Sequence, residues 1–182
     1  MKKIFILLFF IPLSYFSQEL SNEEQKLYDM IMEYRKKKRL PSIPLSKSLT
    51  FVAQTHTKDL IENKPDLGYC NAHSWSKKGN WTPVKYTGAP HQAKYMWNKP
   101  KELTSYEGAG FEIAAGSNDC CSNYIMTADY AFNGFKNSPK HNSVVINKNV
   151  WKGKNKWKAI GISIEGGFAV VWFGEEEDKN NM

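Results

Sequence analysis

Two apolar runs near the C-terminus constrain the fold of this chain more than any other stretch. Residues 157–164 alternate apolar side chains with small or polar ones, and residues 168–173 (FAVVWF) are apolar throughout. The turn sequence EGG at 165–167 separates the two runs, so together they predict a β-hairpin. A strand that is apolar at every position is typical of one that is covered on both faces. The sequence therefore predicts a sheet in which the last strand is central.

Helical patterns supply layers that could cover such a sheet. Ser21 and Glu24 form a capping box before an amphipathic stretch, which Pro41 bounds. A second amphipathic pattern runs over residues 45–60, and apolar residues at helical spacing mark a third helix within residues 125–135. Because no internal repeat or low-complexity linker divides the chain, we expect one domain.

The first 17 residues have the composition of a secretory leader. A Met-Lys-Lys start precedes an apolar run that is too short to span a bilayer. We expect cleavage after residues 1–17, which leaves a domain over residues 18–174 and an acidic tail over residues 175–182. No transmembrane segment is expected once the leader is removed. The protein is therefore expected to be secreted or periplasmic.

The chain has three cysteines, Cys70, Cys120 and Cys121. A disulfide is expected in an exported protein. Adjacent cysteines rarely bond each other because the ring is strained. We therefore expect Cys70 to pair with Cys120 or with Cys121, and either pairing leaves one thiol over. A zinc cluster that joins these cysteines to His73 matches no standard zinc motif.

The formal net charge is +7, and five basic residues stand together at 35–39 (RKKKR). Basic residues suit a helix C-terminus, where they face the negative end of the dipole. We interpret the run as a solvated helix end and expect no nucleic-acid partner, because the run has no interleaved aromatic residues. A basic surface that meets anionic polymers of a cell envelope is a weaker alternative.

Two histidines lie on predicted helices. In residues 135–146 (FKNSPKHNSVVI), Ser138 can cap a helix and Pro139 fits its first position. His141 then lies in the first helical turn, where a neutral imidazole is favoured and can bind metal or accept a proton. By contrast, His56 lies on an apolar helix face and is interpreted as a half-buried core histidine with one hydrogen bond.

Two further stretches carry the remaining candidates for a functional site. Residues 71–75 (NAHSW) contain His73, and residues 110–113 (GFEI) contain Glu112 at the start of a predicted strand. Glu107 is a second acidic candidate, because a slip of one residue in a strand turns a side chain to the other face. The fold would have to gather these residues, which lie far apart in the sequence.

In this order the three stretches resemble the CAP superfamily, which includes the cysteine-rich secretory proteins, the antigen-five venom allergens and the plant pathogenesis-related proteins. The family often shows His followed by Ser or Thr, then a Gly-Glu-Asn-Ile-like strand start. Later comes a helix that ends in Trp-x-x-Ser-Pro-Gly-His-Arg-x-x-Ile. This chain has GFEI at 110–113 and FKNSPKHNSVVI at 135–146. The resemblance covers residues 24–174.

The resemblance implies an α+β fold, a three-layer α-β-α sandwich with a small antiparallel sheet. It also implies a cleft lined by His73, Glu112 and His141, with Glu107 nearby. Family members with a full tetrad carry a second glutamate on the helix before the Ser-Pro-x-His motif. Asp129 is the only acid in that part of this chain, so a fourth metal ligand is in doubt.

The family resemblance implies a secreted binding or interaction module. Its partner would be an unknown extracellular ligand such as a lipid, a sterol or an envelope polymer. We expect a monomer and favour a binding module over an enzyme. Zn²⁺ or another divalent metal would be weakly held by His73, Glu112 and His141. The alternative is a metal-dependent hydrolase of peptide or ester bonds that uses the same cleft, with Glu107 as general base.

Overall fold

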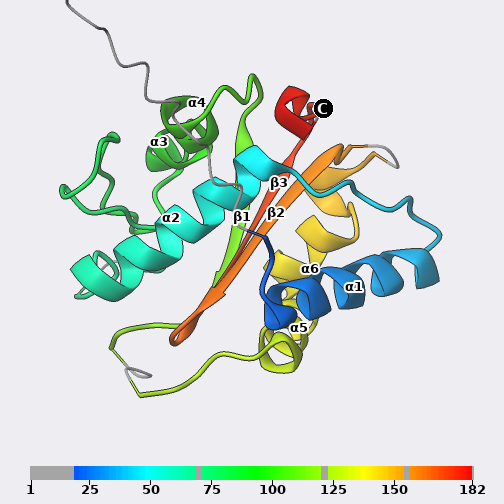
Figure 1. Ribbon diagram of the computed structural model, residues 1–182, viewed down its shortest axis with the longest axis horizontal. Helices are drawn as coiled ribbons and strands as arrows, with labels where there is room; N and C mark the ends of the chain where they lie inside the picture. Colours follow the sequence, from blue (N-terminus) through cyan, green and yellow to red (C-terminus); the bar gives the residue numbers. More distant parts are fainter. Residues whose placement is uncertain (1–18, 69–70, 120–122, 154–155, 182) are drawn as a thin grey trace, which may run out of the picture.

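The computed structural model describes residues 19–68, 71–119, 123–153 and 156–181 (Figure 1). The elements follow one another in this order: α1 (Asn22–Lys37), α2 (Lys47–Asn63), η1 (Pro90–Gln92), α3 (Ala93–Trp97), α4 (Lys99–Leu103), β1 (Gly110–Ala115), α5 (Ala128–Asn137), α6 (Pro139–Val145), η2 (Asn149–Trp151), β2 (Ala159–Glu165), β3 (Phe168–Gly174) and η3 (Lys179–Asn181).

Two predictions fall outside the described residues. They are the leader at residues 1–17 and the disulfide, because Cys70, Cys120 and Cys121 all lie in undescribed positions. Among the helices of the described ranges, none is long and apolar enough to cross a membrane.

The three strands form one antiparallel sheet in the order β1-β3-β2. β3 pairs with β2 from Glu165↔Phe168 to Ala159↔Gly174, and with β1 along its other edge. All seven residues of β3 are buried, because successive side chains of a strand point to opposite faces and both faces are covered. The structure confirms the predicted hairpin and its central strand.

Helices cover both faces of this sheet (Figure 1). On one face, α2 packs against alternate residues of β3, namely Phe168, Val170 and Trp172. On the other face, helices α1, α5 and α6 share a core with the intervening residues Ala169, Val171 and Phe173. The expected α+β fold, a three-layer α-β-α sandwich with a small antiparallel sheet, is confirmed.

The predicted capping box fixes α1 and also ties it to the sheet. The Ser21 hydroxyl accepts a hydrogen bond from the Glu24 backbone N–H at 3.3 Å, and Glu24 Oε2 accepts one from the Ser21 N–H at 2.7 Å. Glu24 Oε1 also accepts a bond from the Ile164 N–H on β2 at 3.1 Å.

The third predicted helix, α5, begins later than its apolar spacing predicts, because Thr127 caps α5 and Ile125 stays exposed.

The basic end of α1 is only partly the solvated helix end that we predicted. Arg35 is fully buried, and its guanidinium donates to the carbonyl oxygens of Pro41 and Val145 and to Asn147 Oδ1. Burial lowers the pKa of Arg35 to about 10. Arg35 therefore joins α1 to the segment after α6, and only the residues that follow it face solvent.

Candidate functional site

Glu112 is the centre of the candidate site. It lies on the edge strand β1 opposite Trp172, on the sheet face that α2 covers. Its side chain is 0% exposed, and a histidine stands at each oxygen. Oε1 lies 2.5 Å from Nδ1 of His56, and Oε2 lies 2.7 Å from Nδ1 of His73. The carboxylate therefore holds two imidazole rings, one at each oxygen.

His56 comes from α2 and is completely buried. Its Nε2 lies 2.9 Å from the carbonyl oxygen of Ser74, and its ring stacks on Trp75 at 4.1 Å. A carbonyl oxygen and a carboxylate oxygen only accept hydrogen bonds, so His56 donates from both nitrogens and carries a positive charge beside ionised Glu112. The sequence predicted a half-buried histidine with one hydrogen bond, and this interpretation was wrong in both respects.

His73 comes from the irregular segment after α2, and its side chain is 19% exposed. Its Nδ1 donates to Glu112, while its Nε2 has no polar contact with the described part of the chain. A carboxylate at one ring nitrogen fixes the tautomer, so the proton is on Nδ1 and the lone pair is on Nε2. His73 therefore keeps an acceptor nitrogen on a partly exposed side chain.

The electrostatics of Glu112 follow from these contacts. Burial by itself raises the pKa of this carboxyl group, because it disfavours the charged form. The charge and hydrogen bond of His56, together with the hydrogen bond of His73, outweigh burial and lower the pKa to about 2. Glu112 is therefore ionised throughout the neutral range and acts as the anion of a buried ion pair.

His141 lies in the first turn of α6, as predicted, and is half-buried with its ring against Phe135 at 5.6 Å. Ser138 is the N-cap residue, but its side chain makes no capping hydrogen bond. Burial lowers the pKa of His141 to about 4, and the proximity of His73 and the charge of Lys140 act in the same direction. His141 is thus a neutral imidazole at pH 7, and it is close enough to His73 and Glu112 for their electrostatics to shift its pKa.

The structure places Glu107 away from these contacts. Its carboxylate pairs with Lys179 at 2.7 Å, and its side chain is 66% exposed. The hydrogen bond from Lys179 lowers the pKa of Glu107. No contact among the described residues joins Glu107 to His73, Glu112 or His141, so the glutamate of the cluster is Glu112.

A metal ion could be bound only by side-chain nitrogens and oxygens that these hydrogen bonds leave available. The described ranges contain no group of three or more His, Cys, Asp or Glu side chains placed to hold a metal ion. Both oxygens of Glu112 and both nitrogens of His56 are engaged, which leaves His73 and His141 as free donors. Asp129 pairs with Lys26 at the surface. Glu112 thus orients His73, and a metal site at His73, Glu112 and His141 stays a prediction.

Sequence reasoning missed a second buried charge behind the cluster. Lys99 is fully buried, and its amino group donates to the carbonyl oxygen of Thr82 and to Glu102 Oε2, both at 2.7 Å. The amino group also lies over the Trp75 ring at 5.6 Å. Burial lowers the pKa of Lys99, although Glu102 and Glu112 oppose this shift. Glu102 lies three residues further along α4, but no local pattern indicates that Lys99 is buried, because Thr82 and Trp75 belong to distant segments.

We expect the metal-free protein to lose stability as the pH falls from about 6.5 toward 4. The folded pKa of His141 is about 4 against an ordinary value of 6.5, so in this window the unfolded state binds a proton that the folded state does not. His141→Gln removes this group and should flatten the dependence, as urea midpoints measured with a chelator at several pH values would show. His91→Gln at an exposed position is the control. An unchanged slope in His141→Gln would contradict the assignment.

Comparisons with known proteins identify what this architecture is similar to. A family model described as the cysteine-rich secretory protein family, CAP, matches residues 28–153. No curated protein matches the sequence significantly.

Three solved structures have a similar fold. An outer surface protein from Borrelia burgdorferi is 20% identical, with a TM-score of 0.53, over 84% of this chain and 92% of that one. An extracellular protein with an SCP domain from Bacillus anthracis is 16% identical, with a TM-score of 0.57, over 87% of this chain and 45% of that one. A cysteine-rich secretory protein from Staphylococcus aureus is 14% identical, with a TM-score of 0.53, over 87% and 40%. This chain spans less than half the length of the last two, and such low identities show the fold alone.

Proposed function

Because the chain belongs to the cysteine-rich secretory protein (CAP) family, we propose that it is an extracellular binding module rather than an enzyme. The observation that carries this proposal is the closed set of bonds around Glu112. Both carboxylate oxygens hold histidines, so the buried side of the cluster is a fixed element of the fold. What it offers to a ligand is the outward-facing Nε2 of His73, with neutral His141 in its electrostatic neighbourhood.

The location outside the cytoplasm is part of the same proposal. The Borrelia and Bacillus proteins are described as an outer surface protein and an extracellular protein. Together with the Met-Lys-Lys start and the short apolar run, these descriptions support a secreted or periplasmic protein. Its ligand would be a lipid, a sterol or an envelope polymer.

A divalent metal such as Zn²⁺ would be held by His73 and His141, with Glu112 orienting the His73 ring. A bound Zn²⁺ would supply a Lewis acid at this position. Two protein ligands are fewer than the three that catalytic zinc sites use, so the ion would be weakly held.

A hydrolase of peptide or ester bonds is the alternative, and one observation favours it. The bond from His73 Nδ1 to Glu112 leaves a lone pair on Nε2, which is the arrangement of a general base. The expected base Glu107 is instead paired with Lys179 at the surface. In this alternative His73 would take a proton from a water molecule, and Glu112 would stabilise the imidazolium that forms.

Calorimetric zinc titration tests the metal site. We expect the wild-type protein to bind Zn²⁺ weakly at neutral pH and His141→Ala to lose this binding, because one of two ligands is gone. His91→Ala removes an exposed histidine elsewhere and should bind as the wild type does. Equal binding by His141→Ala, or no binding by the wild type, would remove the metal from the proposal.

Turnover assays with peptide and ester substrates, with and without Zn²⁺, separate a binding module from a hydrolase. The proposal predicts no turnover that depends on His73. Activity in the wild type that disappears in His73→Ala, while the folded fraction is unchanged, would establish the hydrolase instead.

A further inference from the structure

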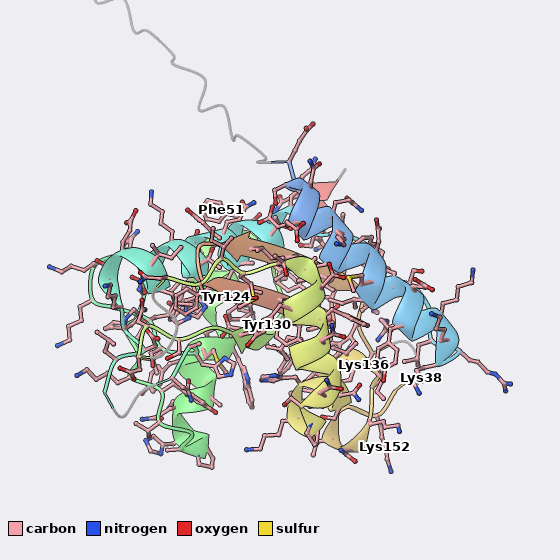
Figure 2. All side chains as sticks on the ribbon, turned by 90° about the horizontal axis from the view of Figure 1, so that it is seen from below. Lys38, Phe51, Tyr124, Tyr130, Lys136 and Lys152 are labelled. Atoms are coloured by element: carbon pink, nitrogen blue, oxygen red, sulfur yellow. The ribbon has the colours of Figure 1, made fainter. Side chains whose placement is uncertain are left out.

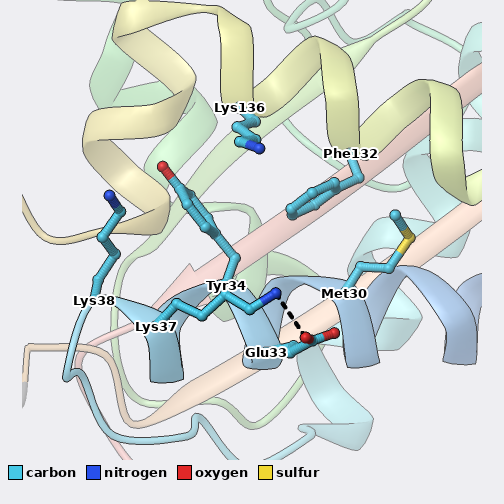
Figure 3. A pocket seen from close by; sticks show the side chains of 7 residues that line it. All are labelled: Met30, Glu33, Tyr34, Lys37, Lys38, Phe132 and Lys136. Carbon is cyan, nitrogen blue, oxygen red and sulfur yellow. Dashed lines mark ion pairs between the residues drawn. The ribbon is translucent and has the colours of Figure 1, made fainter.

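A second candidate site lies in the opposite layer of the sandwich, where α1 and α5 meet. A cleft of about 340 Å³ separates the two helices (Figure 3). Its lining includes Met30, Tyr34, Lys37 and Lys38 on and just after α1, and Phe132 and Lys136 on α5. The volume is within the range of small-ligand sites. The cleft is separate from the histidine cluster, which faces α2.

The floor of the cleft is apolar and fixed. Met30, Tyr34 and Phe132 are half-buried. The Tyr34 and Phe132 rings meet edge to face, with centroids 5.8 Å apart. The Tyr34 hydroxyl donates to Asn142 Oδ1 at 3.2 Å, which ties the ring to α6. This floor can pack against the C–H face of a sugar ring without rearranging.

The rim of the cleft is positive. The amino groups of Lys38 and Lys136 lie 5.4 Å and 5.6 Å from the centroid of the Tyr34 ring, which stands between them in Figure 3. Lys37 is neutralised by Glu33 at 2.7 Å. Neither Lys38 nor Lys136 forms an ion pair with a carboxylate of the described residues. Each therefore carries a positive charge that a bound anion would neutralise.

The positive charge extends beyond the cleft. Lys36 and Arg39, which flank Lys37 and Lys38 in the sequence, are also exposed. In the view of Figure 2, Lys152 lies at the same end of the molecule as Lys38 and Lys136. A ligand with one anionic group would use only the cleft, whereas a chain with repeated anionic groups could meet several of these side chains at once.

We infer that the cleft between α1 and α5 binds a carbohydrate polymer that carries sulfate or phosphate groups. The sugar ring would pack on Met30 and Phe132, and anionic groups of the polymer would pair with Lys38 and Lys136 on either side of the Tyr34 ring. A membrane surface fits less well, because insertion needs protruding apolar side chains. The large exposed apolar residues of the described chain lie elsewhere: Phe51, Leu67, Tyr95, Trp97, Tyr124, Ile125, Tyr130 and Val150.

The test compares two double variants that lose the same charge. The double variant Lys38→Gln/Lys136→Gln removes two positive charges from the rim of the cleft. The double variant Lys77→Gln/Lys101→Gln removes two exposed lysines outside the cleft. Affinity for heparin, a sulfated polysaccharide, is measured against salt concentration. We expect the cleft variant to bind about tenfold more weakly or worse at low salt. The slope of log K against log salt should shrink by about one unit for each lost lysine contact.

The control variant should keep the affinity and the salt slope of the wild type, and melting temperatures verify that both variants are folded. Sulfated and phosphorylated dextrans of equal charge, used as further probes, decide the anionic group, because they carry the same sugar and differ only in that group. An equal loss in both variants would show attraction to net charge alone and overturn the inference. Binding to phosphatidylglycerol vesicles without binding to any of these polymers would also overturn it, in favour of a membrane surface.

Discussion

Replacing Glu112 by alanine is expected to lower the free energy of unfolding by about 3–5 kcal/mol, because it leaves a buried charge without its partner. His56 is completely buried and faces the Ser74 carbonyl oxygen with its other nitrogen. Without Glu112 it must give up a proton or remain a buried unpaired cation, and Nδ1 of His73 loses its acceptor as well. Urea denaturation at pH 7 measures the loss.

Glu112→Gln is the matched control for this change. A glutamine amide can donate to an unprotonated Nδ1 of His56 through its NH₂ group, and its carbonyl oxygen can accept from His73. All hydrogen bonds are then kept without charge, so we expect a loss of about 1–2 kcal/mol. A loss below about 1 kcal/mol in Glu112→Ala would contradict the buried ion pair. Equal losses in both variants would show that charge rather than hydrogen bonding stabilises the cluster.

The effect of Glu112→Ala should also depend on pH. The folded pKa of Glu112 is about 2, below the ordinary value of 4.5. The contribution of a carboxylate with a lowered pKa is complete above the unfolded value and is lost as the pH falls through the folded one. The difference between wild type and Glu112→Ala should therefore shrink between about pH 4.5 and pH 2, which the same denaturation series would show.

Local patterns predicted much of the fold because they report local physics. The apolar run at 168–173 indicated a strand covered on both faces, and the capping box at Ser21 indicated where α1 begins. The start of α5 was less predictable. Ile125 fits the helical spacing, but the Thr127 cap decides where that helix begins.

The candidate site was predicted only in part, because its contacts join distant segments. The motifs supplied His73 and Glu112, and the strand register settled Glu112 over Glu107 by placing it opposite Trp172 under α2. The apolar stripe of α2 indicated that His56 is in the core, but its partner lies 56 residues away in the sequence. The burial of Lys99 had no local signal, because the Thr82 carbonyl oxygen and the Trp75 ring that contact it belong to distant segments.

Gly161→Ala is expected to destabilise the protein by about 3 kcal/mol or more, at the upper end of overpacking effects. Gly161 lies on β2, where α2 crosses the sheet. A Cβ atom at this position would stand 2.0 Å from the backbone carbon of Leu49 and 2.2 Å from the backbone nitrogen of Thr50. Backbone atoms in a helix cannot turn aside as a side chain can. The whole helix must therefore move away from the sheet, and His56 on the same helix moves with it.

Gly134→Ala is the control for this substitution, because it adds the same methyl group in open space. A Cβ at Gly134 on α5 meets nothing within 4 Å, and alanine is favoured over glycine inside a helix by about 1 kcal/mol. This variant should therefore keep or slightly gain stability in thermal and urea unfolding. If Gly161→Ala unfolds at the same denaturant concentration as the wild type, α2 does not approach β2 as closely as the structure shows. A large loss of stability in Gly161→Ala, beside an unchanged stability of Gly134→Ala, would show that α2 needs a glycine at position 161 to approach β2 this closely. The same approach places His56 beside Glu112.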